Sequence, residues 1–114
     1  TFIKNPSHDV VTSYMQNASA LIFPGLDDFA ITPVEAMAAG KPVIAYKSGG
    51  ALDYIVAGVN GDFFKSQTVD ALCSVLQSHI ANNYSSDDIK KSVQKFSVES
   101  FHKNLQTYVY SVLQ

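Results

Sequence analysis

The chain has 114 residues, of which 46% are apolar, so it can bury one hydrophobic core but is too short for two domains. Its net charge of -2, with basic residues that are all lysine and scattered along the chain, argues against a nucleic-acid surface. No apolar run approaches the roughly 20 residues of a membrane-spanning helix, and no signal peptide is evident. We therefore expect a cytoplasmic protein that binds no nucleic acid.

Two single residues add to these expectations. Cys73 is the one cysteine, so it cannot form an internal disulfide, and its place in a helical apolar pattern predicts a buried core position. The chain begins at Thr1 rather than at methionine, and we expect residues 1–114 to be a partial domain of a longer protein.

The first third of the chain predicts alternating strands and helices. A short strand is expected at 1–4, followed by a breaker at 5–7 and a one-sided helix to about residue 17. The apolar run 21–23, closed by Pro24-Gly25, is typical of a buried parallel strand. Thr32 is predicted to cap the next helix, with Pro33 at its first position and Glu35 at its third, and Gly40 is predicted to end it.

The remaining chain continues the alternation. We expect a strand at 42–46, a turn at 47–50, a short helix at 51–57, a strand at 62–64 and a helix at 68–79. Ser85 is predicted to cap a helix that ends near Phe96, and Ser97 to cap the last one. Short strands alternating with helices predict an α/β fold with a doubly wound parallel sheet, whose ligands bind outside the carboxyl ends of the strands.

The segment from Asp27 to Glu35 is the most informative motif. Two acidic residues eight positions apart flank the start of a helix, where free N–H groups and a partial positive charge suit a diphosphate. This segment resembles the glutamate, seven residues, glutamate signature of glycosyltransferase family 4, also called glycosyl transferases group 1. The resemblance continues in order through Gly49-Gly50 with Asp53, Asn60-Gly61 and the run 96–99, and so covers nearly the whole chain.

The resemblance implies the Rossmann-like C-terminal, donor-binding part of a two-domain GT-B glycosyltransferase, with terminal helices. It implies that Asp27 contacts the donor sugar, that Glu35 accepts hydrogen bonds from the ribose, and that backbone N–H groups of Phe29, Ala30, Ile31 and Thr32 bind sugar and phosphate oxygens. The chain departs from the family's pattern at Asp27, where glutamate is usual, and at Ala30, where glycine is usual.

Each of these residues also has a simpler interpretation. Glu35 and Thr32 could serve only the helix cap, and Asp27 could be a solvated loop residue. Gly49 and Gly50 are first of all a tight turn, although the resemblance also places them near the diphosphate. If Ala30 needs a positive φ, it carries strain of about 1 to 2 kcal/mol.

The resemblance also implies an activity and partners. The complete enzyme would be a hexosyltransferase that moves a sugar, with mannose expected, from a GDP- or UDP-linked donor to an acceptor hydroxyl, with retention and without metal or cofactor. The runs 23–25 and 40–46 most resemble mannosyltransferases of bacterial and archaeal polysaccharide and lipopolysaccharide assembly. A separate N-terminal domain would hold the acceptor, so this chain alone should be inactive and contains no certain catalytic residue.

Other interpretations stay open at this point. A non-catalytic nucleotide-sugar-binding module with the same fold is the main alternative, and a flavodoxin-like or receiver-like domain ranks far below it. The last helix has an apolar face that we expect to close the local core, although in related enzymes the terminal helix crosses to the other domain. The parent protein could associate peripherally with the cytoplasmic face of a membrane.

Overall fold

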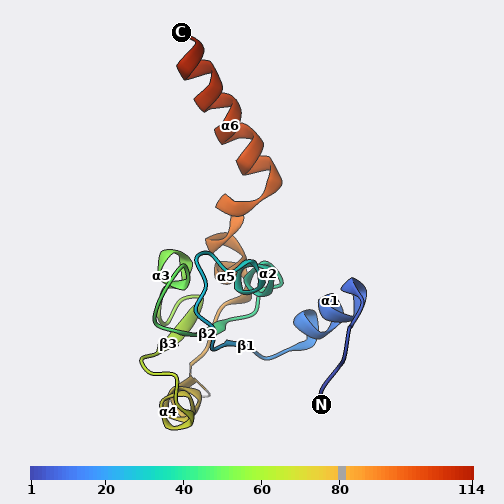
Figure 1. Ribbon diagram of the computed structural model, residues 1–114, viewed down its shortest axis with the longest axis vertical. Helices are drawn as coiled ribbons and strands as arrows, with labels where there is room; N and C mark the ends of the chain where they lie inside the picture. Colours follow the sequence, from blue (N-terminus) through green and yellow to red (C-terminus); the bar gives the residue numbers. More distant parts are fainter. Residues whose placement is uncertain (80–81) are drawn as a thin grey trace.

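The computed structural model describes residues 1–79 and 82–114. It contains short helices and strands in alternation (Figure 1). In chain order these are α1 (His8–Asn17), β1 (Leu21–Phe23), α2 (Ile31–Ala38), β2 (Val43–Tyr46), α3 (Ala51–Tyr54), β3 (Gly61–Phe64), α4 (Val69–His79), α5 (Ser86–Ser92), the 3-10 helix η1 (Gln94–Phe96) and α6 (Val98–Leu113).

The three strands form one parallel sheet in the order β1-β2-β3. Leu21 of β1 lies opposite Val43 of β2, and Val43 in turn lies opposite Gly61 of β3. Figure 1 shows α2, α3 and α5 on one side of the sheet and α4 on the other. The predicted doubly wound α/β fold with a parallel sheet is therefore confirmed.

The hydrophobic core lies between β2 and the helices α2, α3 and α5. β2 is the central strand, and Val43, Ile44 and Ala45 are all buried because helices cover both faces of the sheet. Such a strand is expected to be apolar at successive positions rather than at alternate ones. The core cluster comprises Ala36, Met37, Val43, Ala45, Ala51, Tyr54, Ile55, Ile89 and Val93.

A buried asparagine ties three of these elements together. The Asn60 side chain is fully buried; its Nδ2 donates to the Tyr54 carbonyl at 2.9 Å and to Ser92 Oγ at 3.0 Å, and its Oδ1 accepts from the Val56 N–H at 2.7 Å. The end of α3, the start of β3 and the end of α5 thereby share one polar network.

We expect Asn60→Ala to lower the free energy of unfolding by about 2 to 4 kcal/mol, because it leaves buried groups on α3 and α5 without partners. Urea denaturation measures the loss. Asn83→Ala is the control, since Asn83 is exposed and its removal should change stability by less than about 0.5 kcal/mol. Equal midpoints for the two variants would contradict the role given to Asn60.

Three predictions of the local structure are correct. Ser85 caps α5 and Ser97 caps α6, each by accepting a backbone N–H bond in the first turn, as Ser7 does for α1. Gly40 ends α2 with a φ of 77°, as expected for a helix-terminating glycine.

Two other predictions are wrong. Residues 1–4 form no strand, because β1 is paired on one side only, by β2, and nothing in the described chain pairs with residues 1–4. Cys73 is exposed rather than buried. α4 covers β3 with the side that carries Leu72, Leu76 and His79, and Cys73 lies about 100° further around the helix.

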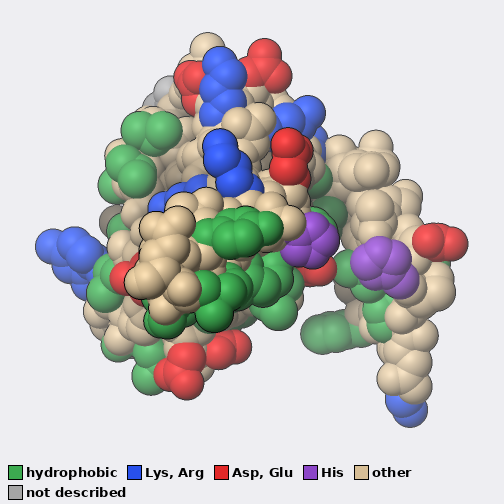
Figure 2. Space-filling view, turned by 90° about the horizontal axis from the view of Figure 1, so that it is seen from above, with side chains coloured by type: hydrophobic (Ala, Val, Ile, Leu, Met, Phe, Trp, Pro, Cys, Tyr) green, Lys and Arg blue, Asp and Glu red, His purple; other side chains and the backbone are tan. Residues whose placement is uncertain are grey.

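The expectation that the last helix closes the local core is also wrong. α6 leaves the body after Ser97 and projects away from it (Figure 1), so its apolar side chains have no core to enter. Figure 2, seen from this end, shows hydrophobic side chains exposed on the surface. The exposed residues on the predicted apolar face are Phe101, Leu105, Tyr108, Val109, Val112 and Leu113.

Candidate functional site

The loop between β1 and α2 lies at the carboxyl end of the sheet, as predicted for a ligand site. The Gly49-Gly50 turn, which follows β2, packs against this loop. The Gly50 N–H donates to the Asp27 carbonyl at 2.9 Å, and a Cβ on Gly50 would collide with the Asp28 carbonyl. Because these glycines lack a Cβ, their backbone lies close against the backbone of the loop. Contact of Gly49 or Gly50 with a phosphate stays a prediction.

Tyr54 of α3 holds the end of the same loop. Its hydroxyl donates to the Phe29 carbonyl at 2.7 Å and shares this bond with the Ala30 carbonyl at 3.1 Å. Its ring packs edge-to-face on Phe29 and Phe96, with centroid separations of 5.5 and 6.1 Å. The sequence analysis did not identify Tyr54, because the motif does not extend to α3 and a tyrosine in an apolar pattern indicates only core.

The environment of Tyr54 keeps its hydroxyl protonated. Burial raises the pKa of Tyr54 above its ordinary value, and the negative charges of Asp27 and Asp53 raise it further. The hydroxyl therefore stays a hydrogen-bond donor to the loop at all physiological pH values.

Ala30 adopts a conformation that is unusual for a residue with a Cβ. Its φ is 66° and its ψ is 94°, and it stands at the N-cap of α2 without a side-chain cap bond. The predicted cap at Thr32 is wrong: α2 begins at Ile31, so Thr32 lies inside the first turn. Ala30, with its positive φ, takes the N-cap position instead, and its carbonyl accepts a bond of 3.1 Å from the Tyr54 hydroxyl.

The start of α2 presents free backbone donors. Within the described residues, the N–H groups of Phe29, Ala30, Ile31 and Thr32 have no backbone acceptor. Ile31 is 67% exposed and Thr32 is exposed too, at a helix terminus that carries partial positive charge, whereas Ala30 is only 7% exposed. An anionic group is the ligand that such a terminus favours.

The two carboxylates of the motif lie on different sides of the site. Asp27 is exposed, and its Oδ1 accepts a bond of 2.7 Å from the N–H of Asp28. Glu35 is exposed and lines a groove of about 300 Å³ between α2 and α1, where His8 and Thr12 also lie. No cap bond involves Glu35, so the capping interpretation is not supported.

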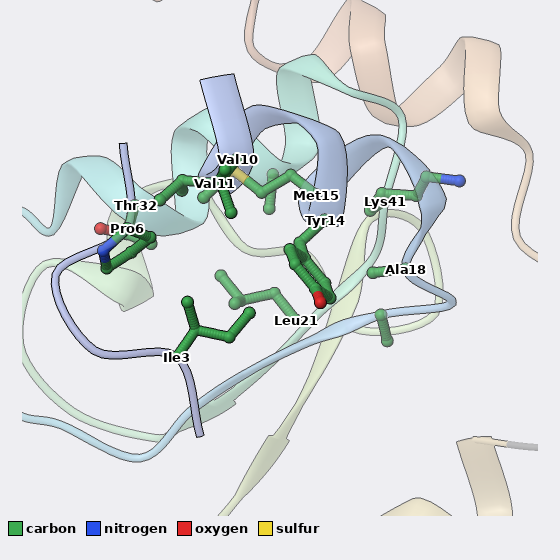
Figure 3. A pocket seen from close by; sticks show the side chains of 12 residues that line it. Ile3, Pro6, Val10, Val11, Tyr14, Met15, Ala18, Leu21, Thr32 and Lys41 are labelled. Carbon is green, nitrogen blue, oxygen red and sulfur yellow. The ribbon is translucent and has the colours of Figure 1, made fainter. Parts of the chain in front are cut away.

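A second cavity adjoins the start of α2. It has a volume of about 380 Å³ and separates α1 and the N-terminal segment from the body of the protein (Figures 2 and 3). Val10, Tyr14 and Met15 of α1 face Leu21 across it, and Thr32 lies at its edge. The structure thus places Thr32 and Glu35 toward α1, and Asp27, Phe29 and Ala30 toward α3.

Two further features of the described residues bear on function. They contain no group of three or more histidine, cysteine, aspartate or glutamate side chains that could hold a metal ion. None of the described helices is both long enough and apolar enough to span a bilayer.

Comparison with known proteins decides the family. The sequence model described as "Glycosyl transferases group 1" matches residues 1–96. The chain belongs to this family. Within it, the chain is 37% identical over 99 residues to the alpha-1,3/1,6-mannosyltransferase ALG2 of Dictyostelium discoideum and 29% identical over 115 residues to ALG2 of Candida glabrata. The predicted resemblance, with its mannosyltransferase character, is confirmed.

These family members are much longer than the chain. The matches cover 82% and 93% of this chain but only 23% and 25% of the two ALG2 proteins. Among solved structures, that of Anabaena HepE in complex with UDP-glucose is similar, with a TM-score of 0.64 over 89% of this chain and 30% of HepE. At 22% identity, this likeness supports the Rossmann-like fold.

The conformation of Ala30 leads to a prediction about stability. Ala30→Gly should raise the free energy of unfolding by about 0.5 to 1 kcal/mol, because relief of left-handed strain exceeds the entropy that glycine loses. Thermal or urea unfolding measures it. Ala71→Gly, inside α4, is the matched control and should lower stability by about 0.5 to 1 kcal/mol. A loss of stability in both variants would show that Ala30 is not strained.

Proposed function

We propose that the chain is the donor-binding part of a retaining, metal-independent glycosyltransferase. The observation that carries this proposal is the row of N–H groups without backbone acceptors at residues 29–32, at the carboxyl end of the sheet, where Ile31 and Thr32 are exposed. A nucleoside diphosphate sugar has the chemistry that such a row fits, since its phosphates are anionic and its sugars are rich in hydroxyls.

Each residue of the site has a proposed role. The N–H groups of Ile31 and Thr32 bind the diphosphate, and those of Phe29 and Ala30 bind oxygens of the sugar. Asp27 accepts hydrogen bonds from sugar hydroxyls, for which its exposed carboxylate is free apart from one bond to Asp28. Glu35 accepts bonds from the ribose; these are charge-assisted and therefore strong.

The proposed reaction is a group transfer. The bond between the anomeric carbon and the phosphate oxygen breaks, and the nucleoside diphosphate leaves with the bonding electron pair. An acceptor hydroxyl forms the new bond to the same face of the sugar and loses its proton. Positive charge at the start of α2 stabilises the negative charge that develops on the leaving diphosphate.

The relatives guide the proposal for donor and partner. Two of them are named mannosyltransferases, and HepE was solved with UDP-glucose, so we propose a hexose donor, mannose first, linked to GDP or UDP. Because the chain spans about a quarter of those mannosyltransferases, we propose that an N-terminal domain supplies the acceptor site. On this proposal the chain alone binds donor but does not turn it over.

Two observations favour a second candidate, a non-catalytic nucleotide-sugar-binding module. Asp27 and Glu35 line different sides of the site, and Ala30 holds a strained conformation that glycine would adopt freely. A module that binds a nucleotide without catalysis does not need both carboxylates to contact the same sugar.

Glu35→Gln should weaken binding of the nucleoside diphosphate sugar by about 1.5 to 3 kcal/mol and leave stability nearly unchanged, because Glu35 is exposed and free of structural bonds. Calorimetric titration of both proteins measures the difference. Glu99→Gln is the matched control, since Glu99 is the other glutamate of the chain and lies at the start of α6. Equal affinity of the unaltered chain and of both variants would contradict the proposed hydrogen bonds between Glu35 and the ribose.

A ligand panel separates the two candidate functions. GDP, UDP, ADP and their sugar conjugates are titrated into the chain. Tighter binding of one conjugate than of its sugar-free nucleotide supports the glycosyltransferase donor site and names the donor. Equal binding with and without sugar favours the non-catalytic module, and absence of all binding overturns both.

A further inference from the structure

We infer that Tyr54 is a positioning residue of the donor site, which sets the direction of the backbone N–H groups that bind the donor. This inference rests on the proposed function and deepens it. Tyr54 does not touch the ligand; it acts on the loop that does, through the carbonyls of Phe29 and Ala30.

The geometry of the peptide bond carries the inference. A trans peptide is planar, and its C=O and N–H point in opposite directions. The carbonyl of Phe29 shares a peptide with the N–H of Ala30, and the carbonyl of Ala30 shares one with the N–H of Ile31. Because one hydroxyl holds both carbonyls toward α3, both N–H groups point away from Tyr54. The same bond therefore turns two consecutive donors toward the ligand.

Tyr54 is itself held firmly. Its carbonyl accepts a bond of 2.9 Å from buried Asn60, and its ring contacts Phe29 and Phe96, which also contact each other at a centroid separation of 5.4 Å. Its side chain is 3% exposed, so its hydroxyl has little freedom to turn to another acceptor. A donor site needs such fixed groups, since ordering loose side chains and loops on binding costs free energy that weakens the affinity.

The same bond explains why Ala30 tolerates a positive φ. Free of the hydroxyl, Ala30 would relax to an extended conformation, and the peptide between Ala30 and Ile31 would rotate. The N–H of Ile31 would then lose its direction even if α2 stayed intact. Loss of the hydroxyl is thus expected to alter the site more than the fold.

The test compares two tyrosine hydroxyls in this chain. Tyr54→Phe removes the bond to the loop and keeps the ring in its aromatic cluster. Tyr84→Phe removes a hydroxyl that donates to the Gly61 carbonyl at 3.1 Å, at the amino end of β3 and so at the opposite edge of the sheet. Both variants lose one half-buried or buried hydroxyl, and thermal melting shows whether their losses of stability are similar.

We expect Tyr54→Phe to bind the nucleoside diphosphate sugar about tenfold more weakly than the unaltered chain, and Tyr84→Phe to bind it equally well. GDP-mannose and UDP-glucose are the probes. Unchanged affinity of Tyr54→Phe, or an equal loss in both variants, would overturn the positioning role while the proposed function stands.

Amide hydrogen exchange separates this outcome from failure of the proposed function. In the absence of any ligand, Tyr54→Phe should change the exchange rates of Ala30 and Ile31, whereas Tyr84→Phe should not. If the unaltered chain binds neither probe, the proposed donor site is refuted. The exchange rates alone then decide whether Tyr54 fixes the loop. Unchanged exchange rates of Ala30 and Ile31 in Tyr54→Phe would refute the role of Tyr54 as well.

Discussion

Three hydrogen bonds fix the segment 27–30 to α3 and its N-cap Gly50, and the candidate site depends on them. The Gly50 N–H holds the Asp27 carbonyl, and the Tyr54 hydroxyl holds the carbonyls of Phe29 and Ala30. All three bonds use carbonyl groups of the loop. Of the N–H groups on the other side of these peptides, that of Asp28 bonds Asp27 Oδ1, whereas those of Ala30 and Ile31 have no backbone acceptor among the described residues, and α2 begins at Ile31. The bonded carbonyls of Phe29 and Ala30 thus adjoin two free donors.

The buried network behind the loop transmits this constraint to the core. Asn60 bonds the carbonyl end of α3, and α3 carries Tyr54, so the position of the loop depends on the packing of α3, β3 and α5. This arrangement explains how a helix of four residues holds a fixed direction: a helix this short has little stability of its own. The site is therefore built on tertiary contacts rather than on local propensity.

Much of the fold follows from the sequence because its signals are local. Serine caps before α5 and α6 and the apolar run of β2 are correctly predicted, and the alternation of strands with helices predicts the parallel sheet. The start of α2 was predicted two residues too late, because Thr32-Pro33 is a strong local cap signal, whereas Ala30 at the observed N-cap bonds Tyr54, which is distant in the sequence. The exposure of Cys73 and of the apolar face of α6 depends on which elements cover them, and periodicity carries no such information.

The candidate site was partly visible in the sequence. The motif identified the loop, both carboxylates and the helix terminus, and the family match agrees with it. It did not reveal that Glu35 faces α1 while Asp27 lies toward α3, nor that Gly49 and Gly50 pack on the loop backbone. These relations join residues far apart along the chain, and spacing within one segment cannot supply them.

Titration of the ¹⁵N-labelled chain with GDP-mannose, followed by amide chemical shifts, tests most directly whether a diphosphate sugar docks at the start of α2. The account predicts that the signals of Phe29, Ala30, Ile31 and Thr32 move together and saturate with one dissociation constant. Shifts confined to α1 and the cavity beside it, with residues 29–32 unmoved at saturation, would contradict it.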